Sequence, residues 1–255
     1  MGLFVGDSQP SKIFVGDTQI SKVFLWDTQI RPSGWQPWAD TVAYRPLTST
    51  TTVNDESWNG NTLTNAWVSF TTYNGVSCAR ITWNADSYHV ADKYLYWSIT
   101  GLPIWANPRT FSLWIYQDNA ASEWEACYLY QGNTYTDGQI ALLQRSSGVY
   151  INTYWNNSAS YVGFVTPTIW QRHNNVLVYD WSKFVYYVNW VQKIAWSRTI
   201  NTYNNNFSLW WAWGGSLQSF NSFNWWLSDI IIEDKAWTQQ DVSDYYDLTK
   251  WNYGL

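Results

Sequence analysis

Short apolar segments, separated by polar turn residues, fill the chain from about residue 39 to its end. They are too short for ordinary helices, and they are rich in the β-branched and aromatic residues that suit strands. Many short strands joined by turns predict an all-β fold, a two-sheet antiparallel sandwich of the jelly-roll type. We expect strands at 43–47, 68–70, 77–81, 88–90, 111–116, 128–130, 140–144, 149–153, 176–179, 184–188, 207–211 and 227–232.

One helix is expected, close to the C-terminal end at 238–246. Thr238 is a favourable N-cap residue, because its hydroxyl can accept a hydrogen bond from the first turn of the helix. Asp241, three residues later, places a negative charge near the positive end of the helix dipole.

The first 32 residues contain an internal repeat. Three ten-residue units follow one another at residues 3–32, with the sequences LFVGDSQPSK, IFVGDTQISK and VFLWDTQIRP. Each unit indicates a strand, a tight turn and a second short strand, and it is too small to have a core of its own. We expect residues 1–34 to form a repeat region and linker before a jelly-roll domain at 39–255. The repeats are either a hairpin array or a partly ordered leader.

Tryptophan stands at positions where turns favour glycine. Trp26 occupies the column that holds Gly6 and Gly16 in the sister repeats. Asn189-Trp190 separates two strands where a two-residue hairpin favours Asn-Gly, because both central residues need positive φ. The chain has 22 tryptophans and only 14 glycines, although turn-rich proteins need glycine. One hypothesis is that the source organism reads the codon UGA as glycine; the alternative is a Trp-rich sugar-binding protein.

Charge and hydropathy exclude several classes of partner. The net charge of −5 argues against nucleic acids and anionic membranes. No apolar run approaches the length of a membrane span, and the N-terminus has no basic and apolar leader. We expect no membrane insertion and a location outside the cell, on a cell surface or on a virion. Cys78 and Cys127 lie in apolar runs, and we expect buried thiols rather than a disulfide.

Four segments carry a family likeness: TFSLWIY at 110–116, WQRHN with VYDW at 170–181, YYVNW at 186–190 and FNWWLSDIII at 223–232. Together with the loop NDESWNGN at 54–61, they resemble a laminin-G-like domain of the concanavalin A-like lectin/glucanase jelly-roll superfamily. The resemblance covers residues 39–250 and implies that Trp114 and Trp170 are core residues. It also implies glycine positions at Trp58, Trp83, Trp181, Trp190 and Trp225.

The same resemblance implies a calcium site. Domains of this superfamily often hold Ca²⁺ near the opening loop and the last strand, where this chain has Asp55 and Asp229. Calcium takes several oxygen ligands, including carbonyl oxygens that a sequence does not reveal. The alternative for Asp229 is a structural carboxylate at a strand edge. No other cofactor is expected.

Acidic residues suitable for catalysis are few. Glycosidases need two carboxylates about 5–9 Å apart, and the chain has only Glu56, Glu123, Glu125 and Glu233 as glutamates. Glu123-Trp124-Glu125 lacks the central Asp and third acid of the glucanase signature, so we expect a solvated loop. Neither His89 nor His173 has a nucleophile pattern around it, and we expect His173 to be structural. We therefore expect no enzyme.

The sequence favours a non-catalytic binding or adhesion module that recognises carbohydrate or a cell-surface partner. Recognition would use loops at one rim of the sandwich or the concave face of a sheet. The chain would belong to a surface protein or a phage tail protein. The alternatives are a structural spacer or decoration domain without a small ligand and, more weakly, a glycoside hydrolase. The oligomeric state stays open.

Overall fold

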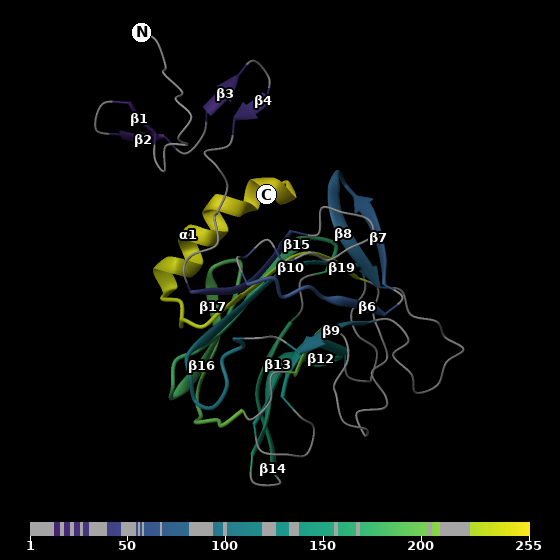
Figure 1. Cartoon of the computed structure of the whole chain (residues 1–255), viewed down its shortest axis with the longest axis vertical. Coiled ribbons are helices and arrows are strands. Elements are labelled where there is room, and N and C mark those ends of the chain that lie inside the picture. Colours follow the sequence, from purple (N-terminus) through teal and green to yellow (C-terminus); the bar gives the residue numbers. More distant parts are fainter. Residues whose placement is uncertain are drawn as a thin grey trace.

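The computed structural model has two antiparallel sheets packed face to face, as the strand pattern predicts (Figure 1). It describes residues 13–15, 18–20, 23–25, 28–30, 40–46, 55, 57, 59–66, 68–81, 94–98, 101–118, 126–132, 138–155, 158–166, 169–202, 206–209 and 225–255. Among these residues, no helix has both the length and the apolar character that crossing a membrane requires.

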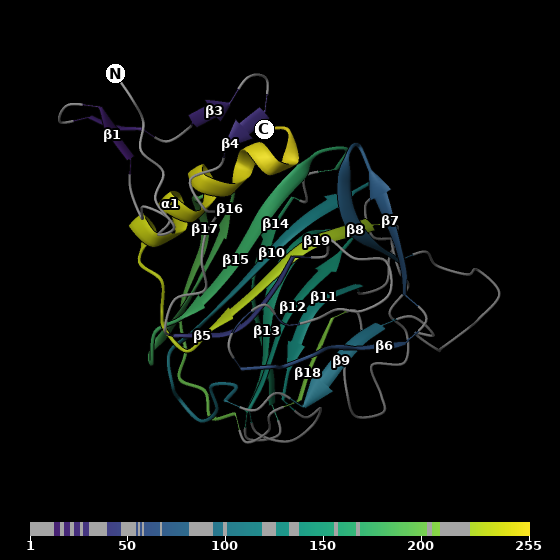
Figure 2. The same cartoon turned by 45° about the horizontal axis from the view of Figure 1, so that its top comes forward.

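The larger sheet has eight strands. In spatial order they are β17 (Val191–Ser197), β16 (Lys183–Val188), β15 (Arg172–Tyr179), β10 (Arg109–Gln117), β19 (Trp225–Glu233), β8 (Val76–Ile81) and β7 (Ser69–Tyr73), with β5 (Thr41–Pro46) also paired to β19. The central strands β10, β15 and β19 are buried along their whole length, which fits a sheet covered on both faces (Figure 2).

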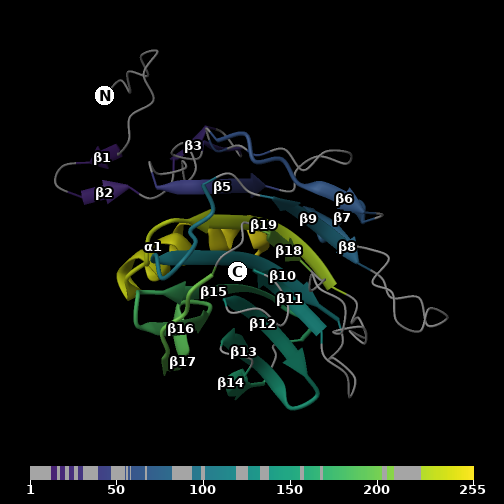
Figure 3. The same cartoon turned by 60° about the horizontal axis from the view of Figure 1, so that its bottom comes forward.

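The second sheet has seven strands. In spatial order they are β14 (Ser158–Val165), β13 (Gly148–Trp155), β12 (Gln139–Arg145), β11 (Ala126–Gln131), β18 (Asn206–Leu209), β9 (Tyr94–Ser98) and β6 (Thr64–Ala66). Figure 3 shows β12, β13 and β14 as neighbouring strands at one side of this sheet. The sequence pattern did not predict β6, β9 and β14, and the strand expected at 88–90 lies outside the described residues.

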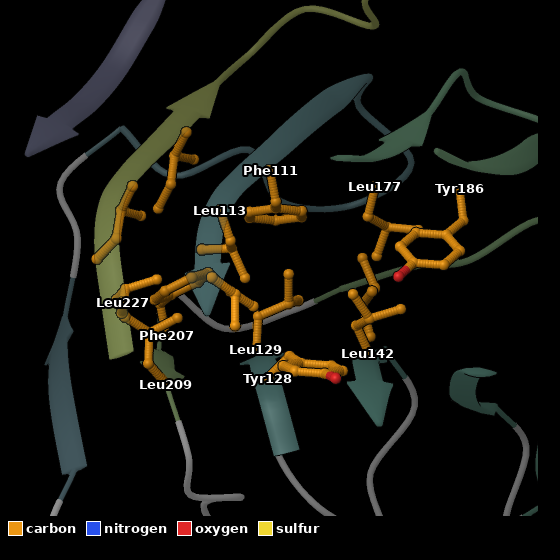
Figure 4. Close-up of a cluster of buried hydrophobic side chains, with 14 of the residues drawn as sticks. Phe111, Leu113, Tyr128, Leu129, Leu142, Leu177, Tyr186, Phe207, Leu209 and Leu227 are labelled. Carbon is orange, nitrogen blue, oxygen red and sulfur yellow. The ribbon is translucent and has the colours of Figure 1, made fainter. Parts of the chain in front are cut away.

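The main core fills the space between the sheets. Alternate residues of both sheets point inward, because successive side chains of a strand face opposite sides. Phe111 and Leu113 of β10 meet Tyr128 and Leu129 of β11 there (Figure 4), and all four are at most 1% exposed. A register shift after Cys127 lets the consecutive residues Tyr128 and Leu129 both face the core. Cys127 and Cys78 are buried free thiols, as expected.

The expected helix is present as α1 (Gln239–Thr249), followed by the short 3₁₀ helix η1 (Lys250–Tyr253). Thr238 is its N-cap and forms a capping box with Asp241, so the predicted start of the helix is confirmed. The helix covers the outer face of the eight-stranded sheet (Figure 2). Trp114 stacks there on Tyr253, with 4.1 Å between the ring centroids.

The predicted core role is confirmed for Trp114, which is 1% exposed, and is wrong for Trp170, which is 64% exposed. Trp170 lies in the turn before β15, where its backbone N–H donates to the Gln117 carbonyl and its φ is 64°. Trp225 also differs from its expected glycine role. It lies buried in β19, and its ring is nearly perpendicular to that of Tyr128, with 5.1 Å between the ring centroids.

A buried arginine holds one end of the sandwich together. Arg109, at the start of β10, is 0% exposed, and burial lowers its pKa to about 9. Its guanidinium donates to the carbonyls of Asn107 and Trp105, and to the side chains of Gln131 and Thr202. One side chain thus ties the segment before β10 to β11 and to the segment after β17.

The second and third N-terminal repeats fold as separate two-stranded hairpins, as the repeat pattern predicts (Figure 1). Their strands are β1 (Ile13–Val15) with β2 (Thr18–Ile20), and β3 (Val23–Leu25) with β4 (Thr28–Ile30). The residues at both turns, including Trp26, lie outside the described part of the chain. The domain boundaries at 34 and 39 stay a prediction.

Candidate functional site

A β-bulge shapes the outer edge of the seven-stranded sheet. Val149 pairs with Val165 and Ile151 with Val162, so Gly163 and Phe164 together stand opposite Tyr150. Residues three apart on a regular strand face opposite sides of a sheet. The extra residue shifts this alternation, so that Val162 and Val165 both pack against the core.

Glycine is needed at the bulge. Gly163 has φ 74°, in the left-handed region that side chains disfavour, and a Cβ there would lie 2.4 Å from the Cδ1 atom of Ile194 on β17. The close approach joins the edge strands of the two sheets. The bulge therefore has two consequences: it closes the sandwich edge, and it sends Tyr161 and Phe164 to the same outer face.

Three aromatic rings gather on this outer face. Tyr150 lies 6.1 Å from Tyr161 and 5.4 Å from Phe164, and the latter two rings lie 6.3 Å apart and are inclined at 64° (centroid distances). Tyr150 is 1% exposed, whereas Tyr161 is 58% and Phe164 47% exposed. We call Tyr150, Tyr161 and Phe164 the aromatic platform: a buried ring supports two rings that are open to solvent.

Polar groups border the platform. Arg145, an exposed residue at the end of β12, holds its guanidinium 5.4 Å from the centroid of the Tyr150 ring. Asn152 of β13 pairs directly with Tyr161 on β14. The amide of Gln139 donates to the Asn152 side-chain oxygen at 3.1 Å, which fixes the orientation of that amide. The site thus combines flat apolar surfaces with a cation and an oriented amide.

A second aromatic cluster lies on the outer face of the eight-stranded sheet and has a different character. Tyr73 stacks on Trp226 at 4.5 Å, and its hydroxyl bonds to that of Tyr116. Trp226 and Tyr116 are only 6% and 7% exposed, and burial raises the pKa of Tyr116 to about 12. Arg172 donates to the Tyr73 carbonyl and to Ser228. Because these polar groups bond to one another, this cluster is structural.

The two residues expected to bind calcium have structural hydrogen bonds. Asp55 accepts from the backbone N–H groups of Tyr44, Ser57 and Asn61 and from the Ser57 hydroxyl, and thereby organises the loop that follows β5. Asp229 of β19 accepts from the Tyr253 hydroxyl at the end of η1. The described residues contain no group of three or more His, Cys, Asp or Glu side chains suited to a metal. Calcium binding stays a prediction.

The two catalytic candidates that the structure describes, His173 and Glu233, are buried within the fold. His173 is 2% exposed, and burial lowers its pKa to about 4, so the imidazole is neutral at pH 7. Glu233 is 0% exposed and accepts from Thr41 and Trp237; burial raises its pKa to about 7. The remaining candidates, Glu56, His89, Glu123 and Glu125, lie outside the described residues.

Comparisons with known proteins find the fold in toxin binding domains. No family model and no curated protein matches the sequence. Among solved structures, the receptor-binding domain of botulinum neurotoxin type G matches with a TM-score of 0.63 and 10% identity, over 83% of this chain and 52% of that one. The serotype D ligand-binding domain in complex with N-acetylneuraminic acid gives 0.63 and 11%, over 82% and 50%. The serotype DC binding domain in complex with rat synaptotagmin II gives 0.64 and 11%, over 82% and 51%.

These similarities confirm the β-sandwich and, at such low identity, show the fold alone. The chain spans about half the length of the structures that it matches. The narrower laminin-G-like assignment stays a prediction. The platform itself was missed by sequence reasoning, which looked to tryptophans and loops. A signal was present in YVGFV at 161–165, where a glycine interrupts the alternation of a strand. A glycine within a strand indicates a bulge, and one aromatic residue lies on each side of this glycine in the sequence, Tyr161 and Phe164.

Proposed function

We propose that this chain is a non-catalytic binding module that recognises carbohydrate through the aromatic platform. The observation that carries the proposal is the pair of exposed rings, Tyr161 and Phe164, held on one face by the bulge and supported by buried Tyr150. The chain would act outside the cell, on a surface or a virion. The named ligands of two matching toxin domains, N-acetylneuraminic acid and rat synaptotagmin II, support the general class of binding module.

The geometry suits a sugar ring. The apolar C–H face of a pyranose packs on an aromatic face, while its hydroxyls need hydrogen-bond partners at the edge. Tyr161 and Phe164 offer the faces, and the Asn152 amide lies in the neighbouring strand. Because the rings are packed on Tyr150 and mounted on paired strands, little side-chain freedom is lost on binding.

A glycan array probed with the whole chain tests the proposal. We expect binding to a defined set of glycans, and we expect Tyr161→Ala to weaken it about tenfold, the equivalent of about 1.4 kcal/mol. Trp251→Ala is the matched control. Trp251 is 51% exposed, but it belongs to η1, which lies on the outer face of the eight-stranded sheet and away from the platform. A blank array, or equal losses in the two variants, would contradict the proposal and favour a structural spacer.

A further inference from the structure

Four tryptophans have a backbone conformation that belongs to glycine. The φ angles of Trp105, Trp170, Trp181 and Trp190 are 58°, 64°, 73° and 65°, all in the left-handed region that bulky side chains disfavour. The other non-glycine residues with positive φ in the described part of the chain are two asparagines, a residue type that tolerates this region. We infer that these four positions are glycine positions, and that the protein made by its source organism carries glycine there through UGA codons read as glycine.

Two hairpins of the molecule provide a direct comparison. The hairpin between β7 and β8 turns at Asn74-Gly75, with φ 49° and 76°. The hairpin between β16 and β17 turns at Asn189-Trp190, with φ 47° and 65°. Both are two-residue connections of antiparallel strands with positive φ at both central residues, the arrangement for which Asn-Gly is preferred. Glycine fills the second position in one hairpin and tryptophan in the other.

The turn between β15 and β16 fixes the backbone of Trp181 from both sides. The carboxylate of Asp180 accepts from the backbone N–H groups of Ser182 and Lys183, at 3.3 and 3.0 Å. The hydroxyl of Tyr179 donates to the Trp181 carbonyl at 2.8 Å. These hydrogen bonds use backbone and neighbouring groups and do not involve the indole ring of Trp181. With glycine at 181 the turn would read Asp-Gly, which is typical of turns between strands.

Trp105 and Trp170 are also held by their backbone groups. The N–H of Trp105 donates to the Thr202 carbonyl at 2.6 Å, and the Trp105 carbonyl accepts from the Arg109 guanidinium at 2.7 Å. The N–H of Trp170 donates to the Gln117 carbonyl at 2.7 Å. Leaving the left-handed region would reorient these groups and break their hydrogen bonds. The fold therefore imposes positive φ at these positions, whichever side chain is attached.

Exposure separates these four rings from tryptophans that the core needs. The four are between 46% and 64% exposed, whereas Trp114, Trp226 and Trp237 are at most 6% exposed. Trp114 stacks on Tyr253, Trp226 stacks on Tyr73, and the indole N–H of Trp237 donates to Glu233. Replacement by glycine would leave a cavity at the three buried positions. At the four positions with positive φ it would remove a ring that lies largely in solvent.

The four tryptophans do not share a binding face. Trp181 and Trp190 flank opposite ends of β16, a strand of six residues that spans about 20 Å. Trp105 lies beside the start of β10, and Trp170 bonds to Gln117 at the end of that strand. A shared backbone conformation without a shared surface is what recoding predicts. A stacking surface for sugars would instead gather the rings on one face.

The recoded chain would present fewer aromatic rings to solvent. Among the side chains that the structure describes, the exposed aromatic ones would then be Tyr161, Phe164 and Trp251. Two of these three belong to the aromatic platform, so the platform would be the main aromatic surface of the described part of the chain. Glycine at the four turn positions thus removes the competing interpretation of a Trp-rich sugar-binding surface.

The codons of the gene and the mass of its product test the inference. We expect UGA at the four positions with positive φ and UGG at the three buried ones, Trp114, Trp226 and Trp237. Peptide mass spectrometry of the protein isolated from its source organism should find glycine at the four sites and tryptophan at the three. UGG codons at Trp181 and Trp190, or tryptophan in the peptides that contain them, would overturn the inference. UGA codons at the three buried positions would overturn it as well, because UGA would then not mark glycine positions.

Discussion

Replacing Trp181 and Trp190 by glycine should stabilise the chain. A left-handed conformation costs an L-residue about 1–2 kcal/mol, and replacement by glycine removes this cost. About 0.5–1 kcal/mol of the stabilisation is lost again, because glycine gives the unfolded chain more conformational freedom. We therefore expect a net gain of about 1 kcal/mol or slightly less at each site. Because the sites flank opposite ends of β16, their effects should add to give nearly 2 kcal/mol for the double variant.

Urea unfolding and thermal melting measure this gain. For a chain of this size, a change of 1 kcal/mol shifts the melting midpoint by about 2–4 °C, so the double variant should melt about 4–8 °C higher. Trp251→Gly is the matched control. Trp251 is 51% exposed, close to the 46% of Trp190, but it lies in η1 without positive φ. There glycine should destabilise, and a loss of stability at Trp190→Gly equal to that control would refute the strain argument.

Three further predictions concern stability. Glu233, with its pKa raised from 4.5 to about 7 by burial, should make the fold less stable as pH rises from 4.5 to 7, by about 3 kcal/mol, because the unfolded chain ionises first. Glu233→Gln should remove this contribution, so urea titrations at several pH values should show the variant gaining about 3 kcal/mol relative to the unaltered chain between pH 4.5 and 7. The comparison uses this difference because buried His173, with its pKa lowered to about 4, contributes with the opposite sign in both proteins. A difference that does not change with pH would refute the prediction. Arg109→Lys should cost about 2 kcal/mol or more, since an ammonium group does not reach all four acceptors; a loss below 0.5 kcal/mol, within the range of ordinary surface changes, would contradict the clamp. Thr238→Ala should cost about 1 kcal/mol through loss of the capping box, whereas Thr238→Ser should keep most of it.

The fold followed from local patterns, and the candidate site did not. Phe111, Leu113 and their neighbours alternate with residues of the other face, and Thr238 with Asp241 marks a helix start, so strands and helix could be expected from the sequence. The aromatic platform depends on one extra residue in β14, which changes the face of every side chain beyond it. Such a register shift is settled by pairing between strands and by the contact of Gly163 with Ile194.

The tryptophans also show how far local sequence patterns predict the environment of a residue. Trp190 could be recognised as misplaced because an Asn-Gly turn has a local signature. The motif that contains Trp170 predicts a core role, yet Trp170 is a turn residue with positive φ and is 64% exposed. The family likeness implies a glycine position at Trp225, which is instead a buried core residue. Where a residue meets partners distant in sequence, its neighbours in the chain do not determine its environment.

The location of a bound glycan tests the central claim most directly. A crystal structure of the whole chain with an oligosaccharide selected on the array should show a pyranose ring packed on Tyr161 or Phe164, with a substituent near Arg145 or Asn152. A glycan bound elsewhere, with both rings uncovered, would contradict the account even if the chain binds sugar.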